Sequence, residues 1–63
     1  MTICMTNGGV YSDVILINDK EVSNIKLEAL NETLENDKFI TISSNKGVKK
    51  AILRTSCISS INL

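Results

Sequence analysis

The sequence predicts an α+β fold, in which a small antiparallel sheet of about five strands packs on one helix within a single domain, residues 1–63. Runs rich in β-branched residues, 39–43 and 48–53, flank Asn45 and Gly47, a pattern typical of a β-hairpin. Leucines recur at helical spacing over residues 27–34. A chain of this length buries only about 60% of the surface that its unfolded form exposes, so we expect marginal stability for one copy.

The N-terminal third predicts two strands joined by a tight turn. Residues 2–6 alternate weakly, and Asn7-Gly8-Gly9 follows with glycines that permit a positive φ. The second strand is expected at about 10–17. Its segment 14–17 is apolar on both faces, so we expect one face to meet the core and the other to meet another subunit. Asn18-Asp19 then predicts a turn.

The only helix is expected to begin at an N-cap, Ser23 or Asn24, and to run to about Asn36. The leucine stripe lies on one side of this helix. Acidic side chains fall on the other side: Glu28, Glu32 and Glu35. The order of elements is therefore strand, strand, helix, strand, strand, strand.

The C-terminal half predicts the hairpin, a corner and a last strand. Thr55-Ser56 is expected to form a corner or a single helical turn, and Ile58 and Ile61 bracket the final strand. The chain contains no proline, so its sheet edges lack one usual protection against pairing with another chain. We therefore expect a homo-oligomer, a dimer or a larger assembly.

The residue types argue against catalysis, a cofactor or a metal site. The chain has no histidine, its acids are scattered, and its two cysteines do not have the spacing of paired metal ligands. Cys57, three residues after Arg54, is the better candidate for a nucleophile, but a small domain more often uses a cysteine as an apolar residue. We expect a protein that is not an enzyme, with buried and unreactive cysteines.

The N-terminus and the hydropathy pattern predict a location. Residues 1–6 have no basic leader or apolar core of a secretion signal, so we expect the cytoplasm and two reduced thiols, Cys4 and Cys57. No apolar run approaches the roughly 20 residues of a membrane span, so no membrane partner is expected.

The charged residues divide the chain into two halves. Residues 1–37 hold all seven acids against two lysines, a balance of −5, whereas residues 38–63 carry five cations and no acid. Cations and hydroxyls near one hairpin suit a phosphate, and an aromatic ring suits a base. We predict these ligand-binding residues: Lys46, Lys49, Lys50, Arg54, Thr55, Ser56, Tyr11 and Phe39.

The same composition ranks the partners. Tyr11 and Phe39 are the only aromatic residues, too few for a stacking platform along a nucleic acid, and the net charge of zero lowers attraction to a long polyanion. A phosphorylated small molecule fits these features better than a nucleic acid. The alternative structural explanation is that the lysines only keep a sheet edge soluble.

The C-terminal half also carries a resemblance. The segment Lys38-Phe39-Ile40-Thr41-Ile42 precedes a glycine-containing turn, and the ending Ile58-Ser59-Ser60-Ile61 follows. In size and pattern the chain resembles the small accessory proteins of phages and prophages of Gram-positive bacteria. This resemblance implies an anti-defence protein in the host cytoplasm, which either coats a host effector or acts as an oligomeric sponge for the nucleotide signals of immune systems such as CBASS and Thoeris.

A second resemblance concerns the last strands. A hairpin and a helical corner precede the final strand, as in small Sm-like or SH3-like barrels, which this part of the chain resembles; the resemblance implies a barrel-like sheet. The leading expectation is an oligomeric protein that sequesters a phosphorylated small molecule, a cyclic (oligo)nucleotide immune signal. The alternatives are an inhibitor of a host defence enzyme that acts through the acidic helix face, and an Sm-like RNA-binding protein.

Overall fold

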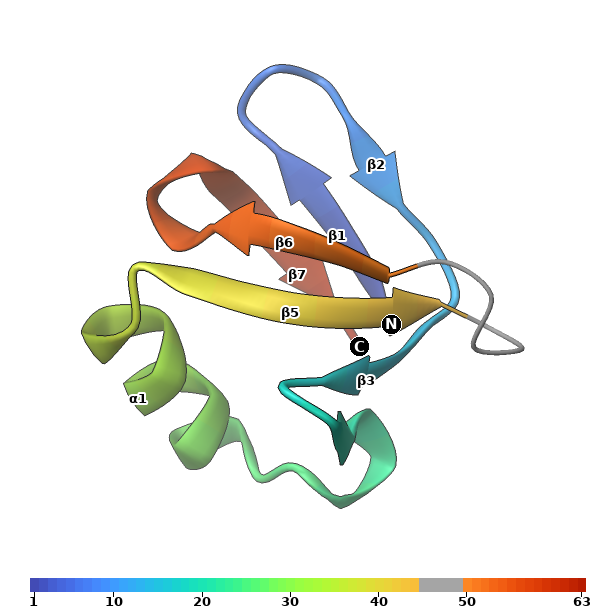
Figure 1. The fold of residues 1–63 in the computed structure, drawn as a ribbon, viewed down its shortest axis with the longest axis vertical. Helices are drawn as coiled ribbons and strands as arrows, with labels where there is room; N and C mark the ends of the chain where they lie inside the picture. Colours follow the sequence, from blue (N-terminus) through green and yellow to red (C-terminus); the bar gives the residue numbers. More distant parts are fainter. Residues whose placement is uncertain (45–49) are drawn as a thin grey trace.

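This computed structural model describes residues 1–44 and 50–63 (Figure 1). In these residues short alternating segments form seven strands, and the segment with the leucine stripe forms one α-helix. Two single 3-10 turns, η1 and η3, complete the order. The elements are β1 (Thr2–Met5), β2 (Val10–Tyr11), β3 (Val14–Ile17), β4 (Lys20–Glu21), η1 (Val22–Asn24), α1 (Leu27–Asn36), β5 (Phe39–Ser44), β6 (Lys50–Arg54), η3 (Thr55–Cys57) and β7 (Ile58–Asn62). This arrangement confirms the predicted α+β class.

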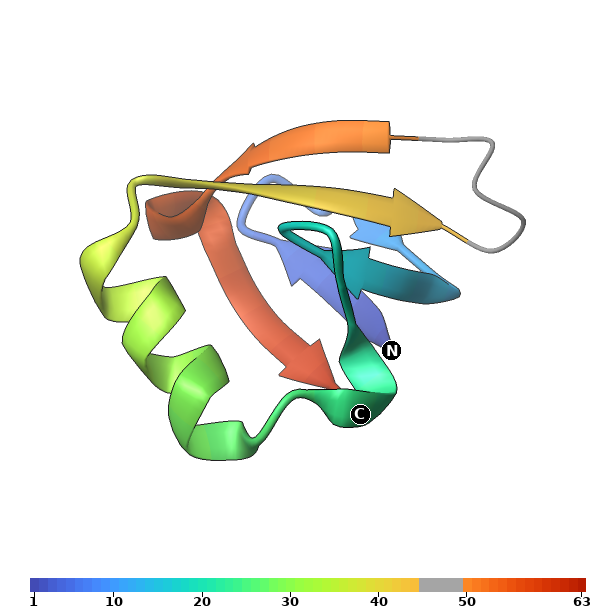
Figure 2. The same ribbon diagram turned by 60° about the horizontal axis from the view of Figure 1, so that its bottom comes forward.

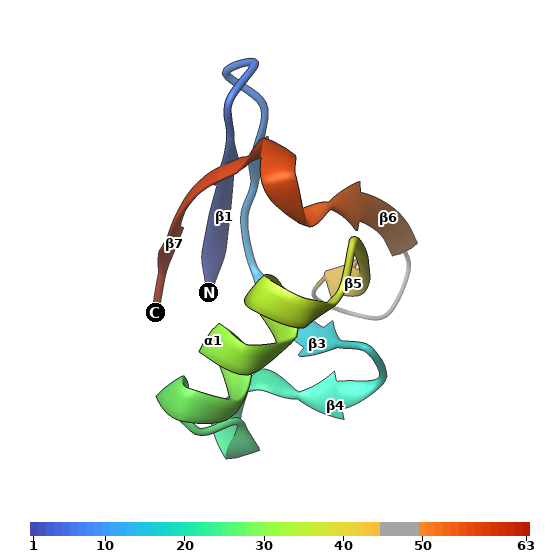
Figure 3. The ribbon, with the colours of Figure 1, turned by 90° about the vertical axis from the view of Figure 1, so that its left-hand side faces the viewer.

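The strands form two antiparallel sheets, in the orders β2-β1-β7 and β4-β3-β5-β6. The chain passes from the first sheet to the second between β2 and β3, where Asp13 has a φ of 56°. This change of sheet divides the predicted second strand into two. Among the described residues the sheets do not close on one another, so the barrel-like arrangement is not confirmed. The helix α1 lies at one side of the sheets (Figure 2), and in Figure 3 it is seen between β7 and the β3–β4 hairpin.

The core lies between the two sheets and α1. Its residues are at most 5% exposed: Ile3, Val14, Ile17, Leu30, Ile40, Ile42 and Leu53. Two of them, Ile40 and Ile42, alternate along β5 and so point to the same face of the sheet. Leu30 is the one buried residue of α1, which is therefore held to the sheets mainly through a single side chain, with Leu34 partly buried beside it.

A β-bulge in β3 explains the apolar segment that was expected to face two partners. Val14 pairs with Ser44 and Leu16 with Ser43, so Ile15 is the extra residue. The bulge allows Val14 and Ile17 both to reach the core. Ile15 is 39% exposed. A single copy thus buries much of segment 14–17 by itself. The apolar character of this segment therefore does not indicate a subunit interface.

The helix begins later than predicted. Neither Ser23 nor Asn24 caps α1, because residues 22–24 form η1 and Ile25 then has an extended backbone (φ −85°, ψ 126°). Ile25 packs against the core in this extended conformation and so separates η1 from α1. The amide Nδ2 of Asn24 instead donates to Oε2 of Glu21 at 3.2 Å. The N-cap position falls on Lys26, and the predicted end at Asn36 is confirmed.

The predicted hairpin, corner and last strand are present. Strands β5 and β6 pair antiparallel, with Phe39 opposite Arg54 and Ser43 opposite Lys50. The corner at Thr55 is the turn η3, and β7 follows it directly. Residues 45–49, which include the predicted turn and two predicted ligand-binding lysines, Lys46 and Lys49, lie outside the described residues.

The four edge strands differ in their protection against pairing. Strands β2 and β4 are two residues long, and β4 consists of a lysine and a glutamate. Strand β6 carries Lys50 and Arg54 at its two ends. Strand β7 has five residues and no charge. Since short length and lysines are what usually protect edges, β7 is the least protected edge among the described strands.

Asn18 ties the β3–β4 turn to β5, and its replacement is expected to destabilise the fold. Its N–H donates to the carbonyl oxygen of Thr41 at 2.7 Å, and its Oδ1 accepts from the N–H of Thr41 at 3.0 Å. Its φ is 50°, a conformation that asparagine tolerates. Asn18→Ala removes the side-chain bond and forces alanine into this conformation, so we expect a loss of about 2 kcal/mol in urea unfolding.

The matched variant is Asn18→Gly, which also removes the side-chain bond but adopts a positive φ without strain. We expect a loss of about 1 kcal/mol for this variant. Equal losses for both variants would show that backbone conformation contributes nothing at this position.

Candidate functional site

Four of the predicted ligand-binding residues line one surface depression. It lies where β5 begins and β6 ends, and its volume is about 480 Å³. The lining residues are Lys38, Phe39, Arg54, Thr55 and Ser56. We call this the Phe39–Arg54 depression. Lys38 was not among the predicted ligand-binding residues. Its position directly before the predicted hairpin could have indicated that it lies at this site.

The register of the hairpin places the ring and the guanidinium together. Phe39 is the first residue of β5 and pairs with Arg54, the last residue of β6. Cζ of Arg54 lies 5.5 Å from the ring centroid of Phe39, which is cation–π geometry. Phe39 is 51% exposed, so the ring remains available to another molecule. The site therefore presents an aromatic surface and a bidentate hydrogen-bond donor side by side.

Thr55 fixes the connection between α1 and β5 against η3. Its hydroxyl donates to the carbonyl oxygens of Asp37 at 2.6 Å and Lys38 at 3.1 Å, and its N–H donates to the carbonyl oxygen of Lys38 at 2.9 Å. The hydroxyl proton is thus used within the protein. Thr55 is a positioning residue for the depression, and Arg54, Lys38 and Ser56 are left as the donors for an anion.

The structure does not bring two other predicted residues to the depression. Lys50 lies at the opposite end of β6, four residues from Arg54 and hence about 13 Å along the strand, although on the same exposed face. Tyr11 belongs to β2 in the other sheet, where it pairs with Ile3. These two side chains lie outside the lining of the Phe39–Arg54 depression.

The lining of the depression is cationic and rich in hydroxyl groups. Its described side chains are two cations, two hydroxyls and one ring, and none of the described residues adds a carboxylate or a thiol to this lining. Both cysteines are free, and both are half-buried where burial was expected. In residues 1–44 and 50–63 no group of three acidic, cysteine or histidine residues has an arrangement that would hold a metal ion.

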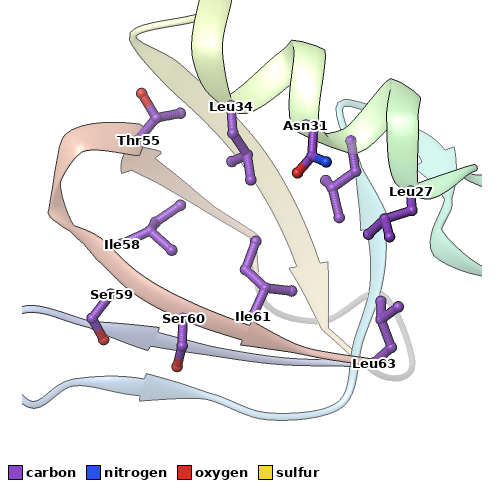
Figure 4. Close-up of a pocket in the computed structure, with 10 residues that line it drawn as sticks. Leu27, Asn31, Leu34, Thr55, Ile58, Ser59, Ser60, Ile61 and Leu63 are labelled. Atoms are coloured by element: carbon purple, nitrogen blue, oxygen red, sulfur yellow. The ribbon is translucent and has the colours of Figure 1, made fainter.

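A second depression lies between α1 and β7 and has a different character (Figure 4). Its volume is about 350 Å³. Leu34, Ile58 and Ile61 point into it, and Leu27 and Leu63 lie toward one end (Figure 4). None of the described residues that line it is charged, so this lining is not suited to an anion. It runs beside the uncharged strand β7.

Neither a membrane-spanning helix nor a known relative identifies a function for the described part of the chain. In the part of the chain that the structure describes, no helix has the length and apolar character needed to cross a bilayer. No protein-family model matches this chain, and neither a curated protein nor a solved structure shows significant similarity to it.

Proposed function

We propose that this protein binds and sequesters a phosphorylated small molecule without transforming it, and that the ligand is a cyclic (oligo)nucleotide of the kind used as an immune signal. In this proposal the chain is a phage-type anti-defence protein. The observation that carries the proposal is the pairing of an exposed aromatic ring with Arg54 beside Lys38 in one depression. A nucleotide needs these two kinds of contact, a face for its base and donors for its phosphate.

The dimensions of the depression agree with a ligand of this size. Its volume of about 480 Å³ falls within the roughly 300–1,000 Å³ that is usual for small-molecule sites. The Phe39 ring offers stacking for one base, and Arg54 and Lys38 offer donors for one or two phosphates. One ring per depression suits a compact ligand better than an extended strand, which needs several stacking residues.

Self-association is part of the proposal. A depression on the surface of one copy leaves a bound ligand open to solvent, and a second copy placed over it would enclose the ligand. The uncharged edge of β7 and the apolar depression beside it, lined by Leu27, Leu34 and Leu63, are the surfaces best suited to that contact. Association would also compensate for the small core of one copy.

Arg54→Ala tests this function. Native mass spectrometry with a panel of cyclic mono-, di- and trinucleotides is expected to give one class that binds, with the copy number of the complex. For that class Arg54→Ala should weaken binding at least tenfold, because charge-assisted bonds to phosphate are lost. The bound nucleotide should be recovered intact after heat denaturation.

Lys50→Ala is the matched control, because it removes one cation from the same exposed face of β6 but outside the depression. We expect less than a threefold effect from this variant, in line with an exposed charge. Equal effects of Arg54→Ala and Lys50→Ala would indicate general charge attraction. Binding of no nucleotide in the panel would contradict the proposal.

An acidic surface supports the second candidate, inhibition of a host defence enzyme. Glu28, Glu32 and Glu35 are all exposed on α1. A row of carboxylates imitates the phosphates of a nucleic acid, so the target would be a nucleic-acid-binding enzyme. Reversal of these three charges should then abolish inhibition, whereas Arg54→Ala should not. The Sm-like RNA-binding alternative would instead show an affinity for RNA that falls steeply with salt.

A further inference from the structure

A third depression separates the β3–β4 hairpin from α1. Its volume of about 520 Å³ exceeds that of the Phe39–Arg54 depression, with which it shares no residue. Its apolar surface comes from the half-buried Ile25 and the exposed Ala29, together with the small exposed parts of the buried Ile17 and Leu30. We call it the hairpin–helix cavity. Its volume falls in the usual range of small-molecule sites, and its described lining combines these four apolar residues with six polar or charged ones.

The cavity collects the cations of the acidic half of the chain. Residues 1–37 contain seven acids and only two lysines, and both Lys20 and Lys26 line this cavity. They reach it from two separate elements, since Lys20 is in β4 and Lys26 precedes α1.

The other polar groups at the rim are mostly engaged within the protein. Glu21 accepts a hydrogen bond from Asn24 at 3.2 Å. Oδ1 of Asn18 accepts from the N–H of Thr41, and the hydroxyl of Thr33 donates to the carbonyl oxygen of Ala29 at 3.0 Å. Glu21 keeps its negative charge, so Lys20, Lys26 and Glu21 give the described lining a net charge of +1, and the two ammonium groups are the places left for an anion.

Lys26 is also an unfavourable residue for its position. It occupies the N-cap of α1 and makes no side-chain capping bond, because a lysine has no oxygen to accept one. Its positive charge lies next to the positive end of the helix dipole. Serine or aspartate would stabilise the helix better, and violations of such a local rule concentrate at functional sites.

From these features we propose that the hairpin–helix cavity binds a small amphipathic anion, with its apolar body against Ile25 and Ala29 and its single acidic head beside Lys20 and Lys26. The head is a carboxylate or a phosphate. This site is independent of the nucleotide site proposed above, so either proposal can fail without the other.

Titration of the whole protein with four probes tests the proposal. Octanoate and octyl phosphate carry both parts of the expected ligand, octanol lacks the charge, and inorganic phosphate lacks the apolar chain. NMR spectra should show shifts of the methyl resonances of Ile25 and Leu30 with the two amphiphilic anions. Octanol and phosphate should bind at least tenfold more weakly. The stronger of the two anions identifies the head group.

The lysine variants separate binding from stability. Lys26→Ser should weaken octanoate and octyl phosphate by roughly three- to tenfold, and should raise the melting temperature by about 4 °C because serine caps the helix. Lys20→Met should weaken binding to a similar degree with little change in melting temperature. Lys50→Met removes the same charge far from the cavity and should leave binding unchanged.

Three results would overturn the proposal. Octanol that binds as well as octanoate would show a cavity that takes apolar molecules without regard to charge. Unchanged affinity in both Lys20→Met and Lys26→Ser would exclude the two ammonium groups as the head-group site. Resonance shifts absent from Ile25 and Leu30 at millimolar probe would show that the cavity is not a binding site.

Discussion

Ile40→Ala is expected to leave much of the protein unfolded at 25 °C. Ile40 is 1% exposed and lies in the middle of the core, at a position of β5 that pairs with the buried Leu53. Replacement of this isoleucine by alanine lowers the free energy of unfolding by about 2–5 kcal/mol, because apolar burial is lost and a cavity remains. A core in so small a domain supplies little more than about 3–5 kcal/mol in total. Urea unfolding followed by circular dichroism measures the effect.

The matched control for Ile40→Ala is Ile52→Ala. Ile52 is in the neighbouring strand of the same hairpin, but it is 72% exposed. We expect a change within about 0.5 kcal/mol for this variant. A large loss of unfolding free energy in Ile52→Ala would mean that another molecule covers this side chain. That result would support self-association.

Leu30→Ala is expected to detach α1 from the sheets. Leu30 is the one buried side chain of the helix, so its removal takes away most of the tertiary contact that holds α1. An isolated helix of ten residues is not stable in water. We therefore expect a loss of about 2–4 kcal/mol together with a loss of helical signal.

Leu27→Ala provides the comparison, because this leucine is on the same helix but is 61% exposed. Its replacement should change the stability of a single copy, measured in dilute solution, by less than about 0.5 kcal/mol. Hydrogen exchange distinguishes the outcomes, since α1 amides should exchange rapidly in Leu30→Ala while β5 amides remain protected. Uniform protection across α1 and β5 in that variant would contradict the expected detachment.

The sequence predicted the elements that local residue preferences determine. The hairpin of β5 and β6, the corner at Thr55 and the strand β7 follow from β-branched runs separated by polar residues. The end of α1 at Asn36 also follows from local polar residues. These features need no knowledge of distant contacts.

Features that depend on contacts between distant segments were not predicted. The helix α1 starts later than predicted because Ile25 packs on the core in an extended conformation. The bulge at Ile15 and the change of sheet at Asp13 depend on how β3 pairs with β5. Periodicity does not report such pairing, which is why one predicted strand became two.

The candidate site was predicted in part for the same reason. Cations and hydroxyls near the corner indicated Arg54 and Ser56, but only the register of β5 and β6 places Phe39 against Arg54. The charge pattern grouped Lys50 with Arg54, although the strand separates them. Lys20 and Lys26 are unremarkable in the sequence, and only the structure shows that they line the same cavity.

The pairing of β1 with β7 has a kinetic consequence. Ile3, which is fully buried, lies opposite Ile61, and the hydroxyl of Ser59 reaches the carbonyl oxygen of Cys4 across 55 positions. Contacts of such wide sequence separation slow folding, typically to milliseconds or longer. A nascent polypeptide cannot complete its native structure until β7 has emerged from the ribosome. Until then the edge of β1 that pairs with β7 is open to chaperones and to neighbouring nascent chains.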